Sequence, residues 1–124
     1  MVSGVVDFTV SPETVYDYLV DPLKRPEWQS SLRAVELLDQ GPVAEGTRWV
    51  DVTKVGVKPR MVLTRAERPT CWVEFGEWGI FTAELTLTFT PTPSGCQVAA
   101  EFEVHARGVA PLGTLVTAIG RRPV

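Results

Sequence analysis

Apolar and polar residues alternate most regularly in the last third of the chain, where they predict two long β-strands. From Phe81 to Phe89 every second residue is apolar, and threonine or glutamate fills the positions between them. A similar alternation resumes after the turn TPTPSG and continues to Val104. Because successive side chains of a strand point to opposite faces, segments 80–91 and 95–107 should form a hairpin with one buried and one solvent-facing surface.

Proline and glycine divide the middle of the chain into further segments of strand length. These segments span 32–39, 46–55, 58–68 and 71–78, and another β-rich segment lies near the N-terminus at 4–10. No long helix is expected between the last six strands, so they should form an antiparallel sheet. The longest strands would reach about 35–40 Å, which predicts strong twist and curvature.

Three helical segments complete the predicted order of elements. Ser11 as N-cap and Pro12 in the first turn predict the start of a helix that ends before the Asp21-Pro22 pair. A second, short helical turn is expected over 25–31. A last helix follows Gly108, and its apolar stripe would fill the concave side of the curved sheet. That stripe consists of Leu112, Leu115, Val116 and Ile119.

Composition favours one ordered domain over residues 1–124. The hydrophobic share is 44% and the charged share 22%, as in ordinary globular proteins. The net charge is −3 and the basic residues are scattered, which disfavours a nucleic-acid partner. No run of 18 apolar residues and no signal-peptide pattern occurs, so we expect a cytoplasmic protein without a membrane span.

The residue types that usually bind metals or cofactors are few. Cys71, Cys96 and the single histidine, His105, match no metal-ligand spacing, and glycine-rich phosphate loops are absent from the sequence. The two cysteines begin alternate strands about 9–10 Å apart, too far for a disulfide. Alternation places His105 on the solvent-facing surface, where it would not serve as a general base. We therefore expect neither a metal nor a cofactor.

Short motifs in a characteristic order resemble the START-like (SRPBCC) superfamily. They are the segment 11–21, Arg-Pro-Glu-Trp at 25–28, Glu-Gly-Thr-Arg at 45–48, Glu-Arg-Pro at 67–69 and Glu-Val-His-Ala-Arg-Gly at 103–108. This group includes bacterial polyketide cyclase/aromatase-like proteins, lipid and sterol carriers, and birch-pollen-type allergens.

The resemblance implies an α+β helix-grip fold with the order β-α-α-β6-α. In that fold a curved antiparallel sheet wraps a C-terminal helix around a hydrophobic pocket. The last helix is short for this group, so we expect a more open pocket. A lipocalin barrel would lack the helix pair after the first strand, and a nuclear-transport-factor-like cone would open with helices.

Four tryptophans in 124 residues suggest either a large aromatic core or an aromatic pocket lining. The resemblance places Trp28 on the short helix near the pocket mouth. It also favours an inward orientation for Trp49 and Trp72. The resulting candidates for ligand contact are Trp28, Trp49, Trp72, Phe81, Ala83, Leu85, Phe102, Leu112, Leu115, Val116 and Ile119.

Two carboxylates are the candidates for catalysis. Periodicity alone leaves the orientation of strand 46–55 open, but registering the strands on the family motifs turns Asp51 and Glu74 inward. Burial in an apolar cavity would raise the pKa of such groups toward the range useful for acid–base chemistry. In the alternative, they lie at the sheet rim and form exposed pairs with Arg48, Lys54, Arg60 or Arg65.

Three functions follow from these observations. The first is a protein that binds a hydrophobic small molecule, polyketide-, lipid- or aromatic-like. The second is a cyclase/dehydratase-like enzyme that uses Asp51 or Glu74. The third is a protein-interaction domain with a collapsed pocket. A cavity below about 150 Å³ would exclude the first two. The oligomeric state is left open, and a homodimer is one arrangement that would cover apolar surface.

Overall fold

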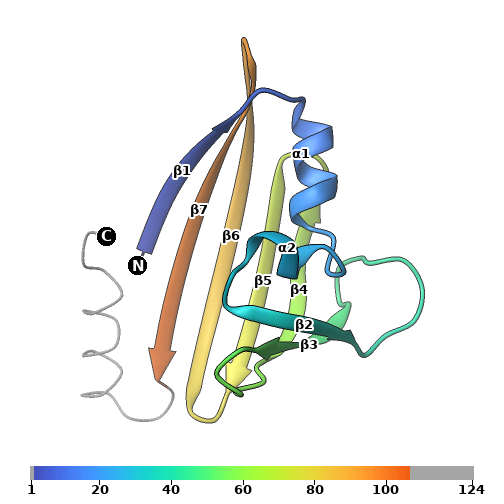
Figure 1. Ribbon diagram of the computed structural model, residues 1–124, viewed down its shortest axis with the longest axis vertical. Helices are drawn as coiled ribbons and strands as arrows, with labels where there is room; N and C mark the ends of the chain where they lie inside the picture. Colours follow the sequence, from blue (N-terminus) through green and yellow to red (C-terminus); the bar gives the residue numbers. More distant parts are fainter. Residues whose placement is uncertain (1, 107–124) are drawn as a thin grey trace.

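The structure is a computed structural model of the 124-residue chain and describes residues 2–106 (Figure 1). The predicted last helix, with Leu112, Leu115, Val116 and Ile119, lies outside these residues. The described elements are β1 (Val2–Phe8), α1 (Pro12–Leu19), α2 (Arg25–Trp28), β2 (Leu32–Leu37), β3 (Arg48–Thr53), β4 (Arg60–Glu67), β5 (Cys71–Trp78), β6 (Phe81–Thr92) and β7 (Gly95–Ala106).

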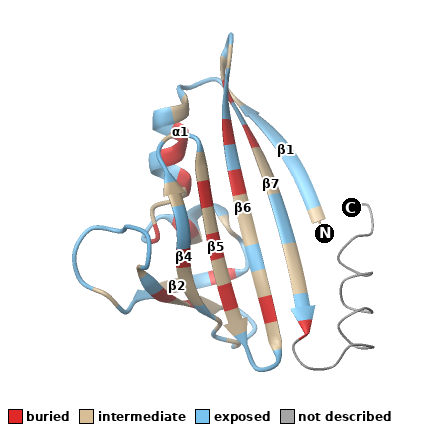
Figure 2. Cartoon of the chain, turned by 180° about the vertical axis from the view of Figure 1, so that it is seen from behind, coloured by how far each residue is buried: buried red, intermediate tan, exposed pale blue. Residues whose placement is uncertain are grey.

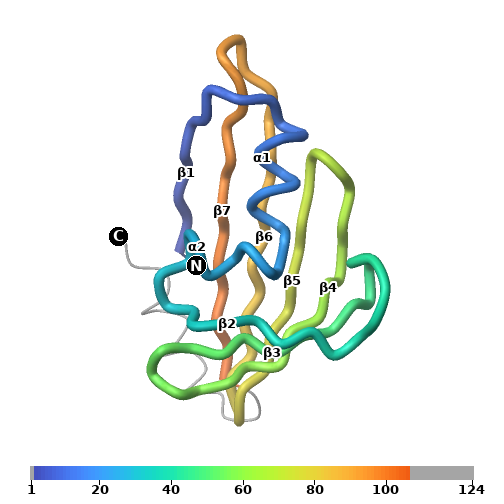
Figure 3. Tube along the Cα trace, turned by 45° about the vertical axis from the view of Figure 1, so that its right-hand side comes forward, coloured from blue at the N-terminus to red at the C-terminus, as the bar shows by residue number. Residues whose placement is uncertain are grey.

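Seven strands form one curved antiparallel sheet in the order β1-β7-β6-β5-β4-β3-β2. Strands β2 to β7 pair with their neighbours in sequence, as predicted. The first strand pairs with the last, from Val2 opposite Phe102 to Phe8 opposite Cys96. The helix pair therefore carries the chain from one edge of the sheet to the other, and β2 and β3 run across the lower ends of the long strands (Figure 3).

Helix α1 begins where the sequence predicts. The Ser11 hydroxyl accepts a hydrogen bond from the Thr14 backbone N–H at 3.2 Å, and Pro12 occupies the first turn. The buried side of the helix carries Val15, Tyr16 and Leu19. These side chains pack on β6 and β7 and so fix the helix on one face of the sheet.

The core lies under α1, where aromatic rings meet edge to face. The ring of Tyr16 is 4.9 Å from that of Phe89 and 6.3 Å from that of Trp72. The indoles of Trp49 and Trp72 are 6.4 Å apart. The Tyr16 hydroxyl donates to the backbone carbonyl of Cys71 at 3.2 Å. Figure 2 shows the buried positions alternating along β5 and β6, with the densest burial at the end near α1.

Helix α2 is shorter than predicted. The pattern predicted a helical turn over 25–31, whereas the helix ends at Trp28. Gln29 is extended, with φ −94° and ψ 96°, and the Leu32 N–H donates to its carbonyl. The chain therefore turns early into β2, which brings α2 close to the sheet.

Candidate functional site

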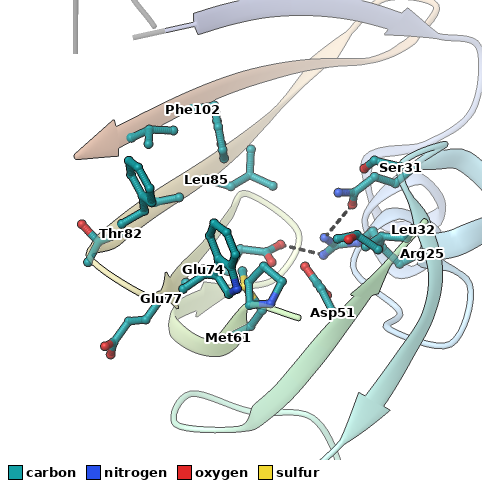
Figure 4. Close-up of a pocket in the computed structure, with 18 residues that line it drawn as sticks. Arg25, Ser31, Leu32, Asp51, Met61, Glu74, Glu77, Thr82, Leu85 and Phe102 are labelled. Atoms are coloured by element: carbon teal, nitrogen blue, oxygen red, sulfur yellow. Dashed lines mark hydrogen bonds and ion pairs between the residues drawn. The ribbon is translucent and has the colours of Figure 1, made fainter. Parts of the chain in front are cut away.

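A cavity of about 280 Å³ lies on the inner face of the sheet, beyond the aromatic core (Figure 4). Its walls are mainly apolar, and a small group of polar side chains forms one end. The lining consists of Arg25, Gln29, Ser31, Leu32, Asp51, Thr53, Pro59, Met61, Glu74, Gly76, Glu77, Trp78, Phe81, Thr82, Ala83, Leu85, Phe102 and Val104. Seven elements and two loops, α2–β2 and β3–β4, thus contribute to one space.

A buried ion pair forms part of the polar end. Arg25 Nη2 lies 2.7 Å from Glu74 Oε1, and the two residues are only 2% and 1% exposed. The same oxygen accepts a hydrogen bond from Trp72 Nε1 at 3.0 Å. Arg25 Nη1 donates to Gln29 Oε1 at 3.3 Å, and the Trp28 ring lies 5.3 Å from the guanidinium carbon. A contact of this kind offsets the cost of burying two charges.

Asp51 lies beside this pair, and within the described part of the chain no cation forms an ion pair with it. It is 7% exposed, and its Oδ1 accepts a hydrogen bond from Trp49 Nε1 at 3.0 Å. Burial raises the pKa of Asp51 to about 6, and the negative charge of Glu74 acts in the same direction. Arg25 and the Trp49 N–H lower the pKa in part. Asp51 is therefore a carboxyl that can gain or lose a proton near neutral pH.

The structure places both predicted carboxylates, Asp51 and Glu74, in the cavity lining. The alternative of exposed pairs at the rim does not describe them. Arg48 forms its ion pair with Asp39, and Arg65 forms one with Glu67. The catalytic role of Asp51 and Glu74 stays a prediction.

Arg25 is one of the site residues that the sequence did not reveal. It stands 49 positions before Glu74, so neither strand alternation nor local spacing connects the two. The Arg-Pro-Glu-Trp motif at 25–28 points to Trp28 and gives no sign that Arg25 is buried. A buried glutamate needs a cationic partner, and an arginine on the short helix that faces the sheet was the available signal.

The aromatic candidates divide into two groups. Phe81, Ala83, Leu85 and Phe102 line the cavity, with Phe102 still 41% exposed. Trp28, Trp49 and Trp72 lie outside its lining.

The physical reason differs among these tryptophans. The rings of Trp49 and Trp72 fill the core, and their N–H groups reach the two carboxylates. Trp28 is 38% exposed and packs against Arg25. The tryptophan in the lining is Trp78, whose ring stacks on Phe81 at 6.2 Å. Continuing the inward register from Trp72 by steps of two would have identified it.

The remaining polar residues offer little further chemistry. Within residues 2–106, no group of three His, Cys, Asp or Glu side chains is placed to hold a metal ion. Cys71 and Cys96 are free thiols, and His105 is exposed near Glu103. In the same range, no helix has the length and apolar character needed to cross a bilayer.

A curved antiparallel sheet, a helix pair between its first two strands and a cavity on its inner face define a START-like (SRPBCC) protein. The family model described as polyketide cyclase / dehydrase and lipid transport matches residues 1–122, and the chain belongs to this family. No curated protein matches the chain.

Solved structures support the fold. A protein from Deinococcus radiodurans is 21% identical, with a TM-score of 0.66 and coverage of 97% of this chain and 93% of that chain. A protein from Mesorhizobium loti is 20% identical, with a TM-score of 0.67 and coverage of 95% and 92%. Ara h 8.0201 is 15% identical, with a TM-score of 0.69 and coverage of 94% and 84%. At these identities, the likeness concerns the fold alone.

Proposed function

We propose that this chain binds a hydrophobic small molecule, polyketide-, lipid- or aromatic-like, in the cavity between α2 and the sheet. The observation that carries the proposal is a space of about 280 Å³ with apolar walls and one polar end. Ligand pockets commonly have this construction, although this one lies at the small end of their size range. The volume argues against a collapsed pocket and hence against a domain used only for protein interaction.

The cover of the cavity is part of the same proposal. Phe102 and Val104 line the cavity from β7, the last described strand. The apolar residues predicted for the last helix would cover this side and complete a helix-grip arrangement. We further propose that the chain is a single domain located in the cytoplasm, with the oligomeric state, monomer or homodimer, left open.

Filling the cavity tests the proposal. Ala83→Phe adds a ring to the cavity lining. The control is Ala99→Phe: Ala99 stands between two inward-facing residues of β7, Val98 and Ala100, so its side chain lies on the outer face of the sheet. An uncharged fluorescent naphthylamine dye should bind the wild type and the Ala99 variant equally. We expect the Ala83 variant to bind it at least about tenfold more weakly, because the added ring occupies the ligand space. Equal binding by all three proteins would place the dye elsewhere and overturn the proposal.

A second candidate function is supported by Asp51. Its carboxyl lines the cavity and has a pKa of about 6, which suits a general base. On a poly-β-ketone, Asp51 would take the proton from a carbon between two carbonyl groups. The resulting enolate carbon would form a bond to the carbon of a further carbonyl group along the chain. The oxygen of that group would then receive the proton from Asp51. Glu74 is less suited to this step because Arg25 and Trp72 hold its Oε1.

The enzyme proposal predicts that turnover of a poly-β-ketone thioester rises with pH as Asp51 ionises, with a midpoint near its pKa of about 6. Asp51→Asn should abolish this turnover while dye binding persists. Unchanged turnover in the asparagine variant would exclude Asp51 as the base.

A further inference from the structure

Among residues 2–106, the inner end of the cavity carries one carboxylate, Asp51, that forms no ion pair with a positive group. Arg25 from α2 and Glu74 from β5 neutralise each other across 2.7 Å. Val35, the residue opposite Asp51 on β2, is apolar, and the β3–β4 loop offers Asp51 only the Pro59 carbonyl, which its backbone N–H contacts. Glu77 also lines the cavity, but Figure 4 shows its carboxylate directed away from Asp51. When Asp51 is ionised, the polar end is therefore anionic.

The hydrogen bonds of Arg25 also indicate that the polar end does not favour an anionic ligand. Arg25 uses Nη2 on Glu74 and Nη1 on Gln29. Its Nε is fully buried without a partner, so it is not presented to the cavity. An anionic ligand would thus find no accessible guanidinium N–H at Nε.

Asp51 presents an open acceptor. Its Oδ1 is held by Trp49 Nε1, and within the described part of the chain no donor is recorded for Oδ2. Among the described residues, Arg25 Nε is the one fully buried side-chain polar atom without a partner. Asp51 Oδ2 is therefore not fully buried, and it is accessible from the cavity that Asp51 lines. A ligand that brings a hydrogen-bond donor would satisfy this oxygen.

The aromatic side chains of the lining suit the apolar part of such a ligand. Trp78 and Phe81 stack with their planes 11° apart, and Phe102 lines the cavity from β7. Aromatic side chains pack favourably against the ring of another molecule. The apolar walls would hold a ring or short chain.

We propose that the preferred ligand is an apolar amine whose protonated nitrogen binds Asp51 Oδ2 and whose ring or chain lies against Phe81 and Leu85. This inference rests on the proposed binding function and specifies the chemistry of the ligand. A buried carboxylate gains most from a partner that brings both a positive charge and an N–H donor. A carboxylate ligand would instead be repelled.

Binding of an amine is linked to protons. A cation beside Asp51 favours its ionised form and lowers its pKa, as neighbouring positive charges do for carboxyls. The free protein has this pKa at about 6. Amine affinity should therefore rise as the pH increases through this range and level off above it, whereas alcohol affinity should not rise in this way.

Three probes of similar shape test the inference: phenethylamine, phenethyl alcohol and hydrocinnamate. Each is titrated into the wild type preloaded with the naphthylamine dye, at pH about 8, where both Asp51 and the amine are charged. We expect the amine to displace the dye at least about tenfold more effectively than the alcohol, and hydrocinnamate to be the weakest.

Two variants assign this preference to Asp51. Asp51→Asn should bind amine and alcohol equally, because it keeps the shape and removes the charge. Glu101→Gln removes the same charge from an exposed position on β7 and should keep the preference. Circular dichroism of both variants checks that they are folded.

The outcomes separate the inference from the function on which it rests. An amine no better than the alcohol, hydrocinnamate as the best ligand, or an amine preference that survives in Asp51→Asn would overturn the inference alone. A dye whose binding is insensitive to Ala83→Phe would overturn the binding function itself. An amine that fails to displace a dye bound in the cavity, even at its highest soluble concentration, would also overturn the inference.

Discussion

Arg25, Asp51 and Glu74 meet at the inner end of the cavity, and each depends on its neighbours in a different way. Arg25 and Glu74 form a buried pair, so neither charge is exposed to water. Among the residues that the structure describes, only the Trp49 N–H donates directly to the Asp51 carboxylate. The consequences for stability are therefore opposite: breaking the pair should weaken the fold, whereas neutralising Asp51 should strengthen it.

Removing one member of the buried pair should be costly. We expect Arg25→Met to lower the free energy of unfolding by about 3 kcal/mol at neutral pH, because Glu74 would be left buried without its cation. The double variant Arg25→Met/Glu74→Gln should recover most of this loss, since the amide oxygen can still accept from Trp72 Nε1. Urea unfolding followed by tryptophan fluorescence measures both. Strictly additive losses in the double variant would contradict a coupled pair.

Asp51 gives a pH-dependent prediction of the opposite sign. Its pKa in the folded chain is raised to about 6, above the usual aspartate pKa of about 3.9, so the folded state disfavours the ionised form. The unfolded state therefore binds fewer protons than the folded state between these values, and stability falls as the pH rises through this window. Above pH about 6 the cost reaches an order of 3 kcal/mol.

Asp51→Asn should remove this cost. We expect the variant to be more stable than the wild type at pH about 8 and to lose this advantage near pH 4. Urea unfolding at the two pH values gives the difference, in which the titration of all other groups cancels. An advantage that does not vary with pH would mean that Asp51 is not the buried, titrating group.

The register of individual residues was more predictable than their partners. Alternation and the family motifs were sufficient to turn Asp51 and Glu74 inward, because a strand fixes the face of every second residue. Nothing local indicates that Glu74 meets Arg25, since that contact depends on how α2 docks on the sheet. For the same reason, three of the four tryptophans were expected in the lining, although Trp49 and Trp72 belong to the core.

Between strands β4 and β5, a glycine determines how the cavity floor is built. Gly76 lies opposite Met61, and a Cβ on Gly76 would stand 2.6 Å from the Met61 sulfur. Both residues line the cavity. Because Gly76 has no side chain, the side chain of Met61 can lie directly against the sheet at this position.

Gly76→Ala should consequently alter binding more than stability. The flexible end of Met61 can move away, and we expect it to enter the cavity and weaken dye binding about tenfold. Gly76→Ala/Met61→Ala should restore binding, because the displaced side chain is removed. A control is Gly4→Ala, where an added Cβ meets nothing within 4 Å. Loss of binding that persists in the double variant would exclude this displacement.

Among the elements, strands were predicted better than the short helix. Proline and glycine divide the chain into segments of strand length, which predicts six of the seven strands, and regular alternation supports the last two of these. The first strand is predicted from its β-rich composition. Helix α2 was overextended because residues 29–31 contain no strong helix breaker. Its end is set by the turn into β2, a tertiary requirement that local propensity does not carry.

Over the whole molecule, the long hairpin of β6 and β7 joins two differently packed halves. One half carries Leu87, Phe89, Cys96 and Val98 and packs under α1. The other half lines the cavity with Phe81, Ala83, Leu85, Phe102 and Val104. Packing density therefore changes along the same two strands.

Hydrogen exchange should reveal this division. We expect amides at 87–89 and 96–98 to exchange more slowly than those at 81–85 and 102–104, because the former lie over the close-packed core. Bound dye should slow exchange mainly in the second group, and the first group is its internal control. Mass spectrometry of peptides from each half makes the measurement. Uniform protection along the hairpin would contradict the division.

For the whole molecule, the antiparallel sheet and its curvature follow from the sequence, whereas the pairing of the first strand with the last does not. Consecutive strands joined by short turns pair with their neighbours, which predicts β2 to β7. The pairing of β1 with β7 joins the two ends of the described chain, and no local pattern indicates it. The cavity also depends on long-range contacts, since its lining comes from seven elements and two loops.

The buried pair of Arg25 and Glu74 also constrains how such sequences can diverge. A substitution at either position alone leaves an unpaired charge in a nearly dry space, whereas a joint change to uncharged residues does not. Among related sequences, these two positions should therefore change together, as an inherited pair. Descendants that have lost the arginine but kept the glutamate should be rare, or should carry a new cation within reach of β5.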